Sequence, residues 1–281
     1  MKKIFVFVFV SMLTAVMAAD VASVPASITV SCGDVTLRLD KAKRWNINSI
    51  KLKNEQLGLD TPGAHYGMTH MVRGSKGFIG SGHIETGIVE EVKSIRFFVD
   101  STETEPAGNM RAKQNFYMEK VSVIGNFEAT YSFSLENNII VENIKLVCLD
   151  KVQLGIVYCF MHPWVTAFKK YYGISPDGEK VSFDMVPDGT FPNQKFMPKI
   201  AMLNPVTGTA LATEITFVRG KPASAKRLMW TRPIYNKDYI VAAASTSLAK
   251  GSIIEITAKT VFFKSTPDTF AADAEKTFMI N

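Results

Sequence analysis

Several features that would point to a specialised fold are scarce in this 281-residue chain. It has three cysteines, Cys32, Cys148 and Cys159, with neither a CxxC pair nor zinc-type spacing, so neither a disulfide framework nor a zinc module organises it. Cys148 and Cys159 lie in apolar segments and are expected to be buried as small hydrophobic residues. Charged residues make up 21% of the chain and hydrophobic residues 47%, which excludes a disordered tail or a collagen-like fibre.

A strong excess of one charge is also absent. The formal net charge is +6, and it falls to +4 if Lys2 and Lys3 are removed with an N-terminal signal. The remaining basic residues are scattered, apart from short clusters at 41–44 and 221–227 that are typical of solvated loops. We therefore expect no nucleic-acid partner.

The first residues carry the pattern of a signal peptide. Lys2 and Lys3 precede an apolar run from Ile4 through Met17, and Val16-Met17-Ala18 supplies small residues for cleavage after Ala18 or Ala19. We therefore expect residues 1–18 to be a signal peptide, residues 19–281 to form one domain, and the protein to be exported to a periplasmic or extracellular location. An uncleaved N-terminal anchor is the alternative. No later apolar run is long enough to span a membrane as a helix.

Alternation of apolar and polar residues dominates the rest of the chain and predicts strands. It is clear at 28–39, where Gly33-Asp34 separates the two arms of a hairpin, and at 127–135, which leads into apolar strands reaching 149 and 161. It returns at 209–218, 239–247 and 252–263. The pattern predicts an all-β fold, a large antiparallel β-sandwich or barrel with few short helices. One helix is expected at the C-terminus, capped by Thr266 with Pro267 in its first turn.

Two irregular regions, 58–87 and 171–200, interrupt the strands. The first holds eight of the 18 glycines and three of the four histidines. Glycines allow close backbone approach to a ligand, and histidines supply titratable donors. We predict a ligand-binding region that uses His65, Arg73, His83 and Glu85; a surface loop with backbone-bonded histidines is the alternative.

The same histidines raise the question of a metal site. His65, His70 and His83, with Glu85, have ligand chemistry suited to zinc, iron or manganese. Neither an HExxH nor an HxH motif is present, so no metal or other cofactor is predicted. A metal-dependent β-barrel enzyme remains an alternative function.

A second candidate region ends the strand that begins at Val152. His162 is followed by Pro163 and Trp164, which places an imidazole beside a flat apolar ring. Such a ring can stack on the C–H face of a sugar, so Trp164 is a candidate ligand-binding residue. A histidine and tryptophan packed at the edge of the core would give the same pattern.

The segment FEATYSFSLENNIIVENIKLVCLDKVQLGIVYCFMHPW, residues 127–164, resembles the middle of galactose-mutarotase-like proteins. This superfamily includes the aldose 1-epimerases, and the resemblance implies a β-supersandwich fold that binds carbohydrate. It also implies that His162 is the general acid and that Glu214 is the general base, acting at the anomeric centre of a sugar. The chain lacks the family's clear Asn-x-x-Arg segment with a following histidine, for which Arg73 and His83 are the stand-ins.

We therefore expect an exported carbohydrate-binding protein, with epimerase activity left open. A non-enzymatic envelope or interaction scaffold of the same fold is the main alternative.

Overall fold

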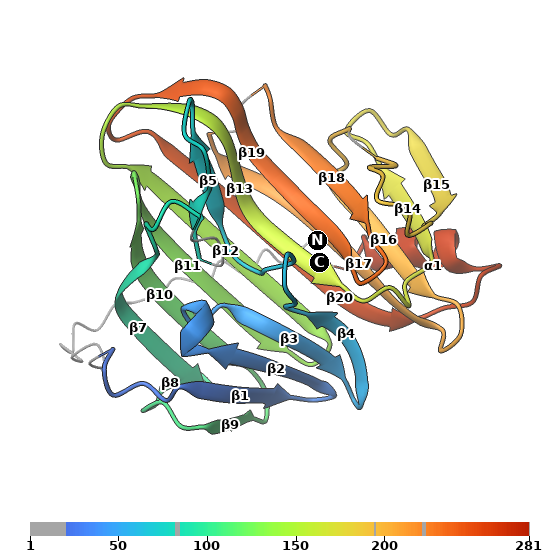
Figure 1. The fold of residues 1–281 in the computed structure, drawn as a ribbon. Coiled ribbons are helices and arrows are strands. Elements are labelled where there is room, and N and C mark those ends of the chain that lie inside the picture. The colour runs from blue at the N-terminus through green and yellow to red at the C-terminus, as the bar shows by residue number, and fades with distance from the viewer. Residues whose placement is uncertain (1–20, 82–84, 194, 221–222, 281) are drawn as a thin grey trace, which may run out of the picture.

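The computed structural model describes residues 21–81, 85–193, 195–220 and 223–280. They form two large sheets that pack face to face, each with ten strands in this described part (Figure 1). Nearly all neighbouring strands are antiparallel, and β1 with β9 is a parallel pair. The predicted all-β sandwich is confirmed.

The first sheet runs in the order β18, β19, β13, β4, β3, β2, β1, β9, with β5 paired to β13 and β6 to β5. The strand bounds are β1 Ser27–Cys32, β2 Val35–Asp40, β3 Ile47–Leu52, β4 Glu55–Leu59, β5 Thr69–Val72, β6 Ile79–Gly80, β9 Asn109–Ala112, β13 Val152–Trp164, β18 Lys226–Thr231 and β19 Asn236–Leu248. A short 3-10 helix, η1 (Lys41–Lys43), joins β2 to β3.

The second sheet runs in the order β15, β14, β16, β17, β20, β12, β11, β10, β7, β8. Its strand bounds are β7 Glu91–Val99, β8 Thr102–Glu103, β10 Phe116–Ile124, β11 Phe127–Glu136, β12 Ile139–Cys148, β14 Lys170–Ile174, β15 Lys180–Asp184, β16 Lys199–Asn204, β17 Thr209–Arg219 and β20 Ile253–Lys264. The α-helix α1 (Phe270–Thr277) packs on its outer face, against alanine and leucine side chains of β16 and β17.

The core lies between the sheets, because alternate residues of each strand point inward. Phe127 and Phe133 of β11 face it from the second sheet, and Leu37 of β2 and Val157 of β13 face it from the first. All three cysteines are buried and unbonded.

The second irregular region differs from the sequence prediction. It contains the hairpin β14–β15, which the many glycines and prolines of 171–200 conceal because they bound very short strands. The first region holds only the short strands β5 and β6 between its turns.

The C-terminal helix begins later than predicted. Thr269 is its N-terminal flanking residue, and Thr266 lies outside the helix. The Thr269 hydroxyl donates to the Asp273 carboxylate (2.7 Å) and lies 3.0 Å from the Thr266 hydroxyl, so a side-chain cluster organises this end.

The predicted signal peptide lies outside the described residues. Among the described residues, no helix has the length and apolarity needed to cross a membrane.

Candidate functional site

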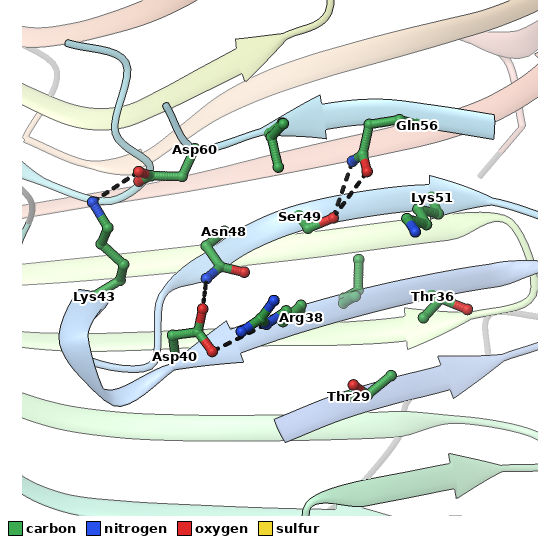
Figure 2. A pocket seen from close by; sticks show the side chains of 12 residues that line it. Thr29, Thr36, Arg38, Asp40, Lys43, Asn48, Ser49, Lys51, Gln56 and Asp60 are labelled. Atoms are coloured by element: carbon green, nitrogen blue, oxygen red, sulfur yellow. Dashed lines mark hydrogen bonds and ion pairs between the residues drawn. The ribbon is translucent and has the colours of Figure 1, made fainter. Parts of the chain in front are cut away.

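A polar groove of about 460 Å³ opens on the outer face of the first sheet, over β1 to β4 (Figure 2). Its floor and walls come from strands that are consecutive in the sheet. The polar lining residues are Thr29, Thr36, Arg38, Asp40, Lys43, Asn48, Ser49, Lys51, Gln56 and Asp60.

Strand alternation explains why polar side chains gather there. In β2, Leu37 and Leu39 are fully buried in the core, so Thr36 and Arg38 point to the opposite, solvent-facing side. The outer side chains of β3 and β4 complete the surface because Ser49 pairs with both Arg38 and Leu59.

Hydrogen bonds hold these side chains in place. Arg38 Nε donates to Asp40 Oδ1 at 3.1 Å, and Asn48 donates to the other oxygen of the same carboxylate. Gln56 Nε2 donates to Ser49 Oγ at 3.0 Å. Arg38 keeps 57% of its side chain exposed, so its remaining donors face solvent.

One end of the groove carries a charged triad, Lys43, Asp60 and His65. Lys43 Nζ lies 2.8 Å from Asp60 Oδ1, and His65 Nδ1 lies 3.1 Å from the same oxygen. Burial opposes ionisation of Asp60, but the hydrogen bonds and charges of His65 and Lys43 outweigh it and hold the pKa of this carboxyl below its usual value. Asp60 is therefore a carboxylate at neutral pH.

An aromatic cluster lies on β13, β18 and β19 and the loop before β16. Trp230 stacks on Phe191 with ring centroids 5.2 Å apart and lies 6.2 Å from Tyr239. Tyr239 in turn lies 4.9 Å from Tyr158. The Arg232 guanidinium sits 4.8 Å from the Trp230 ring centroid, and Trp230 Nε1 donates to the Gly189 carbonyl at 2.8 Å.

A different polar network lies between the sheets. His162 Nε2 lies 2.8 Å from Glu142 Oε2, but the angle is not that of a hydrogen bond. The Tyr131 hydroxyl donates to Glu142 Oε1 at 2.8 Å. Asp238 lies 4.0 Å from His162 Nδ1 and receives a two-point contact from Arg227, whose Nη2 is 2.6 Å away. We call these five residues the interior network.

The structure therefore places two predicted residues in the core. His162 and Trp164 are each 1% exposed, and their rings pack together 5.7 Å apart. Neither ring reaches solvent, and this arrangement matches the alternative of a packed histidine and tryptophan.

Glu214 lies elsewhere. It is on β17 of the second sheet, next to Thr213, whose hydroxyl bonds to Thr260 in the interior. The alternation turns Glu214 to the outer face, where it lies 3.4 Å from Lys199 Nζ. His162, on β13 of the first sheet, thus lies on the inner side of the second sheet, and Glu214 lies on its outer side, so the two side chains do not converge.

The predicted site residues of the glycine-rich region do not come together either. Arg73 and Glu85 are exposed, and His83 lies outside the described residues. His70 is fully buried against Phe127, with ring centroids 4.9 Å apart, and burial lowers its pKa to about 4. Of these predicted residues, His65 reaches the end of the groove. Among the described residues, no three His, Cys, Asp or Glu side chains lie close enough together to hold a metal ion.

Sequence reasoning missed most of the groove. The polar positions Thr36, Arg38 and Asp40 were visible as the outer face of a hairpin, and Lys43 belongs to a cluster interpreted as solvated charge. Only the register of three strands shows that these side chains meet.

Comparison with known proteins finds similar structures but no similar sequence among protein families or curated proteins. No protein-family model matches the sequence, and no curated protein matches it. The Slr1438 protein from Synechocystis sp. PCC 6803 is similar in structure, with a TM-score of 0.54 and 8% identity over 86% of this chain and 96% of that one. The GalM/aldose epimerase homologue from C. elegans gives 0.50 and 10%, over 85% and 99%. The GH36 α-galactosidase AgaB from Geobacillus stearothermophilus gives 0.54 and 8%, over 87% of this chain and 41% of that one.

These similarities define the class of the fold. The protein shares its β-sandwich fold with the C. elegans GalM/aldose epimerase homologue, and this is the fold that the resemblance of residues 127–164 implies. Because the identities are only 8–10%, the similarity establishes the fold, and function must be argued from the sites.

Proposed function

We infer that this protein binds carbohydrate in the groove over β1 to β4. The observation that carries the proposal is the groove itself: a set of pre-positioned amide, carboxylate, hydroxyl and guanidinium groups on a mutarotase-type sheet. Structural neighbours named as an aldose epimerase homologue and an α-galactosidase act on sugars, and they support this class of ligand.

The chemistry of the groove suits sugar hydroxyls. Each hydroxyl donates one hydrogen bond and accepts others, so it is best met by side chains of both kinds held in fixed positions. Asp40 offers acceptors, Arg38 offers donors, and Asn48 offers both. Because the groups are already bonded to one another, binding orders few new side chains, and the entropy cost is reduced.

Calorimetric titration against a panel of mono- and oligosaccharides tests this function. We expect saturable heat with at least one sugar, and a loss of affinity of about tenfold in Arg38→Ala, the size expected for losing a charged hydrogen bond. Arg111→Ala is the matched control, because Arg111 is exposed on β9 of the same sheet and lies outside the groove. Silence across the panel would favour the scaffold alternative.

A second candidate function is acid–base chemistry at a sugar's anomeric centre. It is favoured by His65 and Asp60, an imidazole and a carboxylate in contact at the end of the groove. Opening a sugar ring requires one group to give a proton and another to take one, and histidine is suited to both at neutral pH. Anomeric exchange followed by NMR should slow in His65→Gln and stay unchanged in Glu214→Gln.

Export completes the proposal and rests on residues 1–18 alone. Mass spectrometry of the protein recovered from outside the cytoplasm should find a chain that begins after Ala18 or Ala19. Recovery of an intact N-terminus in the cell interior would contradict export.

A further inference from the structure

One row of residues crosses the outer face of the first sheet from the groove to the aromatic cluster. At the groove, Arg38 pairs with Ser49 and Ser49 with Leu59. At the other side, Lys237 pairs with both Pro163 and Trp230.

The two halves of the row meet between β4 and β13. Gly58 pairs with Trp164 in antiparallel register, so the next residues, Leu59 and Pro163, lie side by side. The complete row is Arg38, Ser49, Leu59, Pro163, Lys237, Trp230.

The spacing of strands gives the length of this row. Five steps of about 4.8 Å separate β2 from β18, so Arg38 and Trp230 are about 24 Å apart. A pyranose unit spans about 5 Å along an extended chain, given bond lengths of about 1.5 Å. Four or five sugar units therefore reach from one end to the other.

The chemistry changes along the row. The Arg38 end is polar, and the Trp230 end is aromatic, where Phe191 is 38% exposed and stacks on the half-buried Trp230. In the middle, Pro163 and Lys237 are buried. Burial lowers the pKa of Lys237 to about 8, and the charge of Asp60 opposes this shift, so the 60–67 loop lies beside Lys237 and is the part of the row's middle that a ligand would meet. The Tyr235 hydroxyl donates to the Gly63 carbonyl (3.3 Å), which ties this loop to the aromatic end.

We propose that the ligand is an oligosaccharide of four or more units, with one end in the groove and the other stacked on Trp230 and Phe191. This rests on the proposed function and adds the size, orientation and second contact of the ligand. Because Trp230 is already stacked on Phe191 and carries the Arg232 guanidinium 4.8 Å from its centroid, the apolar face of the sugar would meet Phe191, the more exposed of the two rings, and the exposed part of Trp230. The groove would contact one end of this ligand, and the aromatic cluster would contact the other.

The chain carries its own reporter of the far end. It has three tryptophans, and Trp45 and Trp164 are 2% and 1% exposed. Trp230, the remaining one, is half-buried on the proposed contact surface. A change of tryptophan fluorescence therefore reports a ligand that reaches β18.

The test is a length series of gluco-, galacto- and manno-oligosaccharides of one to six units, followed by calorimetry and fluorescence. We expect affinity to rise by about tenfold between one and five units, the gain of one good stacking contact. Fluorescence should change only with four or more units. Trp230→Ala should abolish the gain with length and leave binding of short sugars unchanged.

Phe98→Ala is the matched control, because Phe98 packs on Tyr117 (5.5 Å) in the second sheet, away from the row. Equal affinity for one and five units would overturn the inference and leave the proposed function standing. So would loss of short-sugar binding in Trp230→Ala. If sugars of every length fail to bind, the proposed function itself is contradicted.

Discussion

Two histidine–carboxylate pairs in this protein share nearly the same contact distance and have opposite surroundings. His65 lies 3.1 Å from Asp60 at the end of an open groove, and its side chain is 17% exposed. His162 lies 2.8 Å from Glu142 between the sheets, and its side chain is 2% exposed. The chemistry of the two pairs is alike, but only the outer pair can meet a ligand.

We infer from this difference that the interior pair contributes to stability and that the outer pair serves ligand binding. The interior network is closed by Tyr131, Arg227 and Asp238 and holds the two sheets together. The groove is backed by the same sheet but uses the other face of its strands, so changes in one region should leave the other intact. Variants that break this separation would refute it.

The largest expected effect is on the interior network. His162→Leu leaves the Glu142 carboxylate buried without its imidazole and should lower the free energy of unfolding by about 3 kcal/mol. Urea denaturation measures it. Sugar affinity of the folded variant should be unchanged, and a specific loss of binding without destabilisation would contradict the assignment. His162→Leu combined with Glu142→Leu should cost less than the two single changes added together, because no carboxylate is then left unpaired.

Lowering the pH should reduce the free energy of unfolding by a similar amount, because of His70. Its pKa is lowered to about 4 in the folded state against 6.5 in the unfolded chain, so the unfolded chain binds the proton first as the pH falls. The folded state therefore keeps its full stability with respect to His70 above pH 6.5. As the pH falls from 6.5 to 4, the free energy of unfolding drops by about 3 kcal/mol. His70→Leu should flatten this part of the stability curve. Ile79→Val, which destabilises the strand paired with His70 without removing a titrating group, should keep the slope.

A smaller effect is expected at the groove. Asp60→Asn keeps the shape but removes the charge that holds Lys43 and His65, so sugar affinity should fall about fivefold, or roughly 1 kcal/mol. Calorimetric titration measures this change. Asp34→Asn is the control, because Asp34 pairs with Lys53 on the surface outside the groove. Equal losses in both variants would show that Asp60 has no special role.

The smallest effect is expected at Glu214. Its pair with Lys199 is partly exposed, so Glu214→Gln should change stability by less than about 0.5 kcal/mol. Sugar affinity should not change, because β17 belongs to the second sheet. A marked loss of binding would move the site to that sheet and contradict the groove.

The fold could be predicted because alternation is a local signal. Residues 28–39 and 127–135 each show on their own which side faces the core, and residues 127–164 carry enough of the family pattern to indicate the sandwich. The hairpin β14–β15 was missed because its short strands lie among turn residues.

The site could be predicted only in part. His65, predicted from its glycine-rich surroundings, lies at the end of the groove and stays a predicted ligand-binding residue. The groove itself depends on the register of β2, β3 and β4, which single strands do not encode. The burial of His162 could not be predicted for the same reason. It lies on the inward face of β13 beside Glu142 of the facing sheet, twenty positions earlier, and a polar residue at a strand end looks alike in a core and in an active site.

The groove can be tested with a crystal structure of the protein soaked with the sugar that gives the largest calorimetric heat. We expect sugar density against Arg38, Asn48 and Asp60 on the outer face of the first sheet, extending toward Trp230 for a long oligosaccharide. Density against His162 between the sheets, or beside Glu214 on the second sheet, would contradict it.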